Sequence, residues 1–207
     1  MRLLERPVAR GAHRRRLDPG RDTTPGPGTL RRGPTSSQKK GRYSTDDTKR
    51  AGKVRVGDGA PDFALTSQHG ETVRLGDLIG EKAVVLYFYP RDGTPGCAAE
   101  ACSFRDGYED FVEADAEVVG VSSDSAESHE RFAAGNGLPF ILLSDGGGEV
   151  RKLYGVSSTL GIFPGRVTYV IDKRGVVRHV FSSQFGATRH ADEALKVVQA
   201  LNEESPG

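Results

Sequence analysis

Two cysteines, Cys97 and Cys102, are the residues of this chain best suited to covalent chemistry. They lie in the stretch Pro90-Arg-Asp-Gly-Thr-Pro-Gly-Cys97-Ala-Ala-Glu-Ala-Cys102, between an apolar run and a segment with helical spacing. Pro95 and Gly96 predict a tight turn, which places Cys97 in the first turn of the following helix. Unsatisfied N–H groups and the positive end of the helix dipole favour a thiolate there, and the thiolate is the reactive form of cysteine.

Each of these residues also has a purely structural interpretation. A buried cysteine that only packs is the commoner role for this residue type, but the Pro-Gly turn at a helix start argues for a reactive Cys97. The hydroxyl of Thr94 could lie beside the sulfur and hydrogen-bond an incoming oxygen, although a threonine before a proline is often only a turn residue.

The spacing of Cys97 and Cys102 predicts a switch between two states. Five residues advance about 7.5 Å along a helix and turn the side chain by about 140°, which puts the two Cα atoms roughly 8 to 9 Å apart. A disulfide rarely tolerates more than about 7 Å. A bridge between the two cysteines therefore requires the first turns of the helix to unwind. Packing of Cys102 on the helix face is the open alternative.

Other chemistries of cysteine fit this sequence less well. The spacing is not the C-x-x-C of a dithiol exchanger, and two cysteines are too few for a four-thiolate zinc site. A Cys-His acyl-transfer site would need one of the scattered histidines beside Cys97. None of these is spaced with the cysteines like a metal ligand: His13, His69, His129, His179 and His190. We expect no metal and no other cofactor.

Apolar patterning after residue 52 alternates between strands and helices. The longest apolar run, from Ala83 to Tyr89, has the length of a strand buried on both faces. Around it we expect strands over 72–75, 117–122, 140–143, 167–171 and 176–181, and helices over 98–113, 126–134, 149–154 and 190–201. The turn at 172–175 predicts a hairpin. This order predicts an α/β fold whose central sheet is mixed but mostly parallel and is flanked by helices.

The formal net charge of +1 hides two segments of opposite charge. Residues 1–52 hold 14 basic and 5 acidic side chains, and residues 53–207 hold 15 basic and 23 acidic ones. The first segment shows neither a helical nor a strand period, so we expect a disordered basic tail, either a targeting segment or an over-extended start. Residues 53–207 are enough for one domain with a sizeable core.

Targeting and partner signals are weak. No apolar run approaches the roughly 20 residues of a membrane helix, and Leu3-Leu4 is followed at once by Glu5-Arg6-Pro7, unlike a secretory signal. We expect a soluble cytoplasmic protein; an organellar transit peptide is the alternative, although the tail's acidic residues fit it poorly. The Arg clusters lack interleaved aromatic residues for specific readout, so we expect no nucleic-acid and no membrane partner.

The pattern Pro90-x-x-x-Thr94-x-x-Cys97 resembles the active-site motif of the peroxiredoxins. With Cys102 five residues later, it is most similar to their PrxQ, or bacterioferritin comigratory protein, branch, and especially to plant and cyanobacterial members. The chain departs from the family at Ala98, where a threonine is common, which leaves the named roles untouched. The resemblance runs from about Gly57 to Leu201 and is carried further by Ala60-Pro-Asp-Phe63, Val84-Val-Leu-Tyr-Phe-Tyr-Pro90, Leu142-Leu-Ser-Asp145, Pro164-Gly-Arg166-Val-Thr-Tyr-Val-Ile-Asp172, Ser183-Gln-Phe185 and His190-Ala-Asp-Glu-Ala-Leu195.

This resemblance implies a thioredoxin-like fold and an antioxidant thiol peroxidase that reduces hydrogen peroxide and organic hydroperoxides. It implies Cys97 as the peroxidatic and Cys102 as the resolving cysteine, joined in an intramolecular disulfide that thioredoxin or a similar dithiol reduces. Pro90, Thr94 and Arg166 complete the implied active site; without the motif, Arg166 would be taken for a surface residue at a strand edge. We expect a monomer. If the N-terminal segment is a transit peptide, the resemblance implies that its destination is a plastid.

A function of another class stays open at this point. The same disulfide switch could serve a non-enzymatic peroxide sensor or binding module whose basic tail engages a partner. Turnover distinguishes the two, because a sensor would react once and would be inert to thioredoxin.

Overall fold

A computed structural model describes residues 53–156 and 165–204 of the chain, so the tail expected over 1–52 lies outside the described residues. Within them, seven strands form one sheet in the order β2-β1-β5-β4-β3-β6-β7. The strands are β1 Ala64–Ser67, β2 Thr72–Arg74, β3 Ala83–Phe88, β4 Ala116–Ser122, β5 Ile141–Ser144, β6 Val167–Ile171 and β7 Val177–Ser182.

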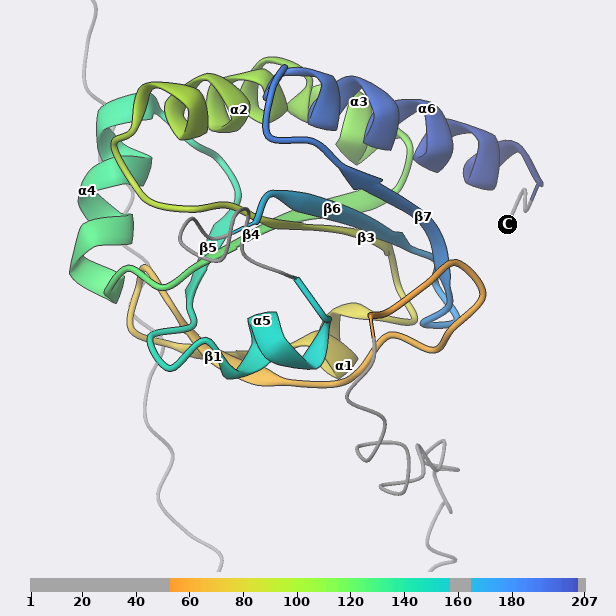
Figure 1. Ribbon diagram of the computed structural model, residues 1–207. Helices are drawn as coiled ribbons and strands as arrows, with labels where there is room; N and C mark the ends of the chain where they lie inside the picture. Colours follow the sequence, from red (N-terminus) through yellow and green to blue (C-terminus); the bar gives the residue numbers. More distant parts are fainter. Residues whose placement is uncertain (1–52, 157–164, 205–207) are drawn as a thin grey trace, which may run out of the picture. The chain divides into compact units, whose positions relative to one another are not determined.

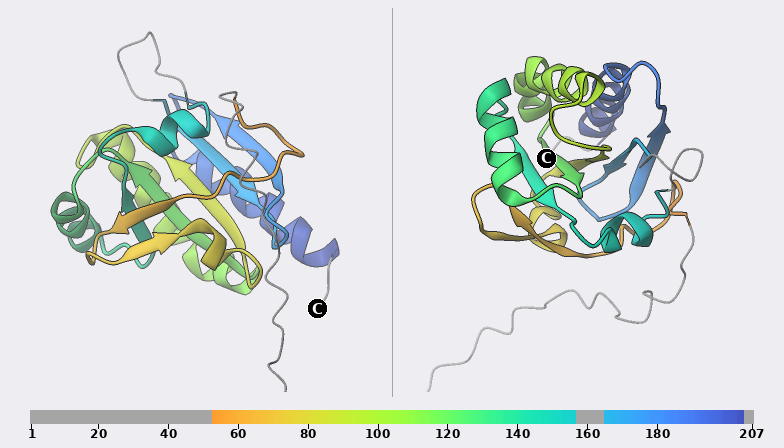
Figure 2. Two further views of the ribbon diagram at one scale, coloured as in Figure 1. Left: turned by 90° about the horizontal axis from the view of Figure 1, so that it is seen from below. Right: turned by 60° about the vertical axis from the view of Figure 1, so that its left-hand side comes forward.

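Helices cover both faces of this sheet, as Figures 1 and 2 show. Helices α2, α3, α4 and α6 pack on one face, and the short helices α1 and α5 lie on the other. Their bounds are α1 Leu75–Leu78, α2 Pro95–Asp106, α3 Tyr108–Glu113, α4 Ala126–Asn136, α5 Glu149–Leu153 and α6 Arg189–Glu204.

The central strand β3 divides the core into two halves because its side chains alternate between the faces. Val85 and Tyr87 pack with the helices α2, α3, α4 and α6, whereas Val84, Leu86 and Phe88 pack toward α1 and α5. All six residues of β3 are buried, as its uninterrupted apolar sequence predicts. The carboxyl end of β3 therefore leads from the middle of the sheet directly into the loop before α2.

The sheet is mixed, as expected, but the expectation that most of its pairings are parallel is wrong. Among the described strands, β3 with β4 and β4 with β5 pair in parallel, and the other four pairings are antiparallel. Parallel neighbours need a connection that returns the chain across the sheet. Strand β6 runs antiparallel to β3 and starts opposite its carboxyl end, with Val167 facing Phe88.

Most predicted elements have ends shifted by one to three residues, and one predicted helix is divided in two. The helix expected over 98–113 starts earlier, at Pro95, and is divided at Gly107 into α2 and α3. Glycine favours such a break because it has the least restricted backbone and a low helix propensity. The strand expected over 72–75 ends at Arg74, where Leu75 begins the four-residue helix α1. Strand β1 had no counterpart among the predicted elements.

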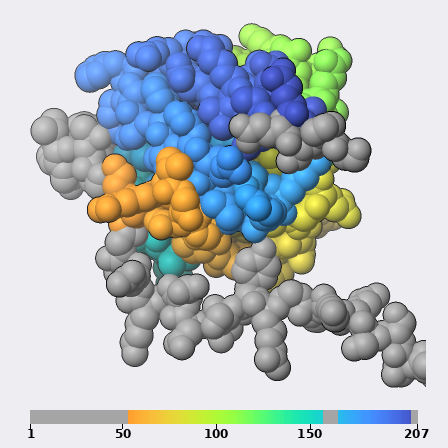
Figure 3. Space-filling view, turned by 90° about the vertical axis from the view of Figure 1, so that its right-hand side faces the viewer, coloured from red at the N-terminus to blue at the C-terminus, as the bar shows by residue number. Residues whose placement is uncertain are grey.

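The late hairpin is confirmed, with β6 and β7 antiparallel around the turn 172–175. The first described residues pair with this hairpin: the amide of Gly57 donates to the carbonyl of Val177, and that of Ala60 donates to Gly175. Figure 3 shows this segment, in orange, against the blue surface of the hairpin. No helix among residues 53–156 and 165–204 is long and apolar enough to cross a membrane.

Candidate active site

Cys97 lies in the first turn of α2, as its position after Pro95 and Gly96 predicts. Thr94 is the N-cap residue, and its Oγ1 accepts a hydrogen bond from the backbone N–H of Cys97 at 3.4 Å. Proline at the first helical position suits this start because that position needs no N–H donor. The Cys97 residue is 1% exposed, so its sulfur lies beneath the surface at the positive end of the helix.

Arg166 reaches the Cys97 sulfur from the other side of the loop. It precedes β6 by one residue, and the antiparallel register of β6 with β3 brings it to the carboxyl end of β3. Its Nη2 lies 3.4 Å from the Cys97 Sγ, and the residue is only 4% exposed. A buried guanidinium beside the sulfur stabilises a thiolate. The interpretation of Arg166 as a surface residue is therefore wrong.

Glu100 binds the same guanidinium and was not singled out from the sequence. Its Oε2 forms an ion pair with Nη1 of Arg166, and both side chains are buried. Burial raises the pKa of Glu100 above its ordinary value, although Arg166 opposes the rise. A detectable signal was present, because Glu100 follows Cys97 by three residues and so shares its side of the helix.

His190 closes the far side of this cluster from the start of α6. Its Nδ1 lies 3.6 Å from Oε1 of Glu100 and 2.8 Å from Oγ1 of Thr168, and its Nε2 lies 3.0 Å from the carbonyl oxygen of Ser183. Burial lowers the pKa of His190 to about 4, so the ring is neutral at physiological pH. No local pattern in the sequence indicated this role.

Arg151, from helix α5, holds together the two backbone segments that carry the site. Its Nη2 donates to the carbonyl of Tyr89 at 2.7 Å, and its Nη1 donates to the carbonyl of Gly165 at 2.9 Å. These carbonyls belong to the residues just before Pro90 and Arg166, so Arg151 fixes the separation of the two predicted positions. The sequence predicted the helix but not this contact, which depends on tertiary packing.

The loop between β3 and α2 is shaped by backbone and cap interactions. Pro90 follows β3 and is half-buried, and Gly93 has a φ of +69°, which favours glycine. The Thr94 hydroxyl donates to the carbonyl of Arg91 at 3.4 Å while it accepts from Cys97. Both bonds are long, so a peroxide oxygen could replace either partner.

A second polar cluster anchors this loop to α4. The carboxylate of Asp92 lies 2.9 Å from Nδ1 of the buried His129 and accepts hydrogen bonds from the hydroxyls of Tyr89 and Ser128. Burial by itself raises the pKa of Asp92, but the hydrogen bonds from His129, Tyr89 and Ser128 outweigh burial and lower it. The cluster ties the loop to α4 without contacting the sulfur of Cys97.

Cys102 lies farther along the same unbroken helix and does not contact Cys97. Both thiols are free, and Cys102 is half-buried. Its Sγ lies 3.8 Å from Oδ1 of Asn136, the last residue of α4. The structure thus has Cys97 grouped with Thr94 and Arg166, and Cys102 apart from them at the contact of α2 with α4.

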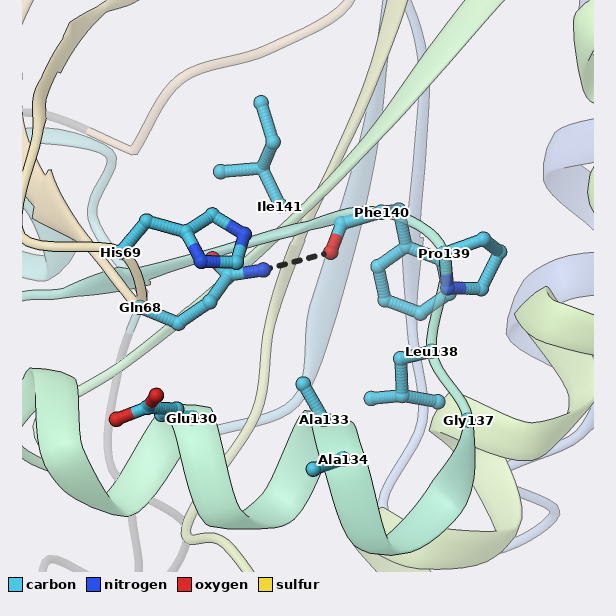
Figure 4. Close-up of a pocket in the computed structure, with 10 residues that line it drawn as sticks. All are labelled: Gln68, His69, Glu130, Ala133, Ala134, Gly137, Leu138, Pro139, Phe140 and Ile141. Carbon is cyan, nitrogen blue, oxygen red and sulfur yellow. Dashed lines mark hydrogen bonds between the residues drawn. The ribbon is translucent and has the colours of Figure 1, made fainter.

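One cavity of the described structure is separate from this thiol cluster. A cavity of about 420 Å³ lies between α4 and β5, where Gln68 donates to the carbonyl of Phe140 at 3.1 Å (Figure 4). None of the residues lining it is a predicted site residue. In the described part of the chain, no group of three or more His, Cys, Asp or Glu residues could hold a metal ion.

Comparisons with known proteins agree on one family. The family model described as "AhpC/TSA family" matches residues 56–180. "Peroxiredoxin Q, chloroplastic" from Sedum lineare is 55% identical over 150 residues, which cover 72% of this chain and 80% of that protein. The protein of the same name from Triticum aestivum is 53% identical over 151 residues, covering 72% of this chain and 69% of the relative.

Solved structures give the same result for the fold. The peroxidoxin BcpB of Mycobacterium tuberculosis superposes with a TM-score of 0.67 at 40% identity, covering 72% of this chain and 98% of that one. A peroxiredoxin Q of Xanthomonas campestris gives a TM-score of 0.63 at 30% identity, covering 67% and 90%. The expected α/β fold of the thioredoxin-like peroxiredoxin type is confirmed.

Proposed function

The chain belongs to the AhpC/TSA family and is a peroxiredoxin, a thiol peroxidase, and from this premise we propose that Cys97 is its peroxidatic residue. The observation that carries the proposal is the placement of the Cys97 Sγ at a helix N-terminus, 3.4 Å from the buried Arg166 guanidinium. The sensor alternative is not supported, because the named relatives are peroxiredoxins.

In the first step the Cys97 thiolate attacks one oxygen of hydrogen peroxide or an organic hydroperoxide. The S–O bond forms, the O–O bond breaks, and the leaving hydroxide or alkoxide takes up a proton. Negative charge grows on this leaving oxygen, so fixed donors aimed at it lower the barrier. We assign this task to Arg166, to the Thr94 hydroxyl and to the Cys97 backbone N–H, and we assign exclusion of water to Pro90.

In the second step the Cys97 sulfenic acid condenses with the Cys102 thiol and releases water. The two residues occupy one intact helix, so the first turns of α2 must unwind before the sulfurs can meet. A thiol reductant then restores both thiols; we propose thioredoxin or a similar dithiol, and we propose that the chain acts as a monomer without a cofactor.

Replacement of Cys97 tests the first assignment. Reduced full-length protein mixed with one equivalent of hydrogen peroxide should lose both thiols and gain an intramolecular disulfide. Stopped-flow fluorescence and mass spectrometry monitor this conversion. Cys97→Ser should abolish turnover with thioredoxin and its reductase, because no thiolate remains at the helix start. The control Ala99→Ser places the same new side chain on an exposed position of α2 and should turn over normally. Turnover by Cys97→Ser would overturn the assignment.

Replacement of Cys102 tests the second step separately. Cys102→Ser should still consume one equivalent of peroxide, because Cys97, Thr94 and Arg166 are intact. Its sulfenic acid should then persist, overoxidise, or require an external thiol. A sulfenic-acid trap and mass spectrometry measure this species. If the variant cycles normally with thioredoxin, the resolving thiol lies elsewhere.

The relatives' names also bear on location. The plant relatives are named chloroplastic, which supports the plastid alternative for this chain and gives the cytoplasmic expectation no support. Import of a fluorescent protein fused to residues 1–52 into isolated chloroplasts decides the point, and absence of import would exclude the plastid alternative.

A further inference from the structure

One buried cation, Arg166, faces two acidic groups at once. Its Nη2 lies 3.4 Å from the Cys97 Sγ, and its Nη1 forms the ion pair with the Glu100 Oε2. The exposed fractions of the three residues are 4% for Arg166, 1% for Cys97 and 0% for Glu100. If Cys97 and Glu100 were both ionised, the cluster would carry a buried net negative charge, which is costly away from water.

The other charged groups around the cluster do not remove this excess. Arg151 is the second cation near Cys97: burial lowers its pKa, and the nearby Asp145 and Cys97 oppose that effect. Its guanidinium donates to the carbonyls of Tyr89 and Gly165 rather than to the sulfur, and the charge of the buried Asp145 offsets its own. Tyr87 faces Glu100 from β3 and stays neutral, because burial raises its pKa well above the ordinary value. His190 supplies no positive charge at neutral pH.

The surroundings of the second Glu100 oxygen favour a proton there. The Nε2 of His190 must carry the ring hydrogen, because its partner, the Ser183 carbonyl, only accepts. The Nδ1 of His190 therefore has a lone pair, which accepts from the Thr168 hydroxyl and faces Oε1 of Glu100 at 3.6 Å. Oε1 has no hydrogen-bond partner among the described residues. An ionised Oε1 would thus face a lone pair and have no donor to stabilise its charge, so its surroundings disfavour the charged form.

We propose that Cys97 and Glu100 share a single proton around Arg166, and that Glu100 holds this proton on Oε1 while the sulfur is a thiolate. The unprotonated Oε2 can still accept from Arg166, as the ion-pair geometry requires. Glu100 then acts as a positioning residue that adjusts the charge of Arg166. The inference rests on the peroxidatic role proposed for Cys97.

Protons and charge balance within the site during the first step of the reaction. The thiolate attacks the peroxide, sulfur is oxidised to the sulfenic acid, and the peroxide is reduced to hydroxide or alkoxide, which takes up one proton. Loss of the thiolate charge leaves Arg166 without an anion, so Glu100 releases its proton and becomes the counterion. Thiolate, hydroperoxide and protonated Glu100 give sulfenic acid, water or alcohol, and ionised Glu100. No net proton is drawn from the solvent.

Proton counting tests this prediction in full-length Cys102→Ser, in which the reaction stops at the sulfenic acid. One equivalent of hydrogen peroxide is added to weakly buffered protein at about neutral pH with an indicator dye, and the sulfenic acid is quantified with a trap. We expect almost no net proton uptake by Cys102→Ser. The double variant that also carries Glu100→Gln should take up about one proton per sulfenic acid, because a single titrating group then remains beside Arg166. Glu113→Gln, an exposed position on α3, should behave like the parent.

An infrared difference spectrum identifies the group that loses the proton. In the parent, addition of peroxide should remove the C=O band of a protonated carboxyl, and this change should be absent in Glu100→Gln. Both parent measurements remain decisive if Glu100→Gln fails to fold. Uptake of one proton by the parent, or no loss of a carboxyl band, would overturn the inference. Absence of trapped sulfenic acid would instead contradict the proposed role of Cys97.

Discussion

The site is assembled from single residues that are remote in sequence and buried together. Cys97 and Glu100 come from one helix, Arg166 from the start of β6, and His190 from the start of α6. At this scale the decisive quantity is charge, because each buried ionised group needs a partner. The neutral His190 accommodates Glu100 without adding a charge, and this neutrality makes the free energy of folding depend on pH.

We predict that the stabilising effect of His190 is lost as the pH falls. Its folded-state pKa of about 4 lies below the ordinary value, so the unfolded chain binds a proton between about pH 6.5 and 4 that the folded chain does not. Stability from this residue is therefore full above about pH 6.5 and declines below it. His190→Gln should lower the free energy of unfolding at both pH values. The decrease should be smaller at pH 5 than at pH 7.5, by on the order of 2 kcal/mol.

Urea unfolding at the two pH values measures this difference. The exposed His69→Gln serves as the control for the substitution itself and is measured at the same two pH values. An equal cost of His190→Gln at pH 5 and pH 7.5 would mean that His190 is not held neutral in the fold.

At the scale of elements, α2 combines a weakly held start with a well-packed remainder. The cap contacts at Thr94 are 3.4 Å long, whereas Ala101 and Phe104 are buried in the core. Unwinding of the first turns breaks these long cap bonds, separates Arg166 from Cys97 and Glu100, and removes Cys97 and Ala101 from the core. The sheet beneath α2 is closely packed, and strand β4 shows how closely.

Glycine substitutions should have opposite effects in β4 and α4. A Cβ at Gly120 would lie 2.7 Å from Cδ2 of Leu142 and from the ring of Tyr87, so Gly120→Ala should destabilise the protein by about 1–3 kcal/mol. A Cβ at Gly135 would meet no atom within 4 Å, so Gly135→Ala should stabilise α4 by roughly 0.5–1 kcal/mol. Thermal unfolding checks both, and a stabilising Gly120→Ala would contradict the packing of β4 against β3 and β5.

At the scale of the molecule, the acidic part of the chain holds every residue assigned to the reaction. Pro90, Thr94, Cys97, Cys102 and Arg166 all lie within the matched segment, 56–180. The first described residues nevertheless contribute to the fold, because Val54 is buried and Gly57 and Ala60 bond to the β6–β7 hairpin (Figure 3). The charge boundary near residue 52 therefore predicts where the chain can be shortened.

Removal of residues 1–52 should leave the peroxidase kcat/KM and the unfolding midpoint unchanged within about twofold and a few degrees, since no assigned residue is lost. Removal of residues 1–61 should lower the midpoint clearly, because it deletes Val54 and the backbone bonds of Gly57 and Ala60. Calorimetry and a coupled peroxidase assay compare both with the full chain. A loss of activity in the shorter deletion would assign the basic segment a part in the reaction.

The sequence by itself determined the local features of this protein: the buried strand that begins at Ala83, the place of Cys97 in the first turn of a helix, the five-residue spacing to Cys102, and the motif that indicated the family. These depend on neighbouring residues and on periodicity. Only the tertiary structure decided the strand order, the predominance of antiparallel pairings, and the meeting of Glu100 and His190 with the Arg166 that contacts the sulfur. Strand order and charge balance arise from contacts between distant segments, whose burial sets the energies, and a local pattern does not contain them.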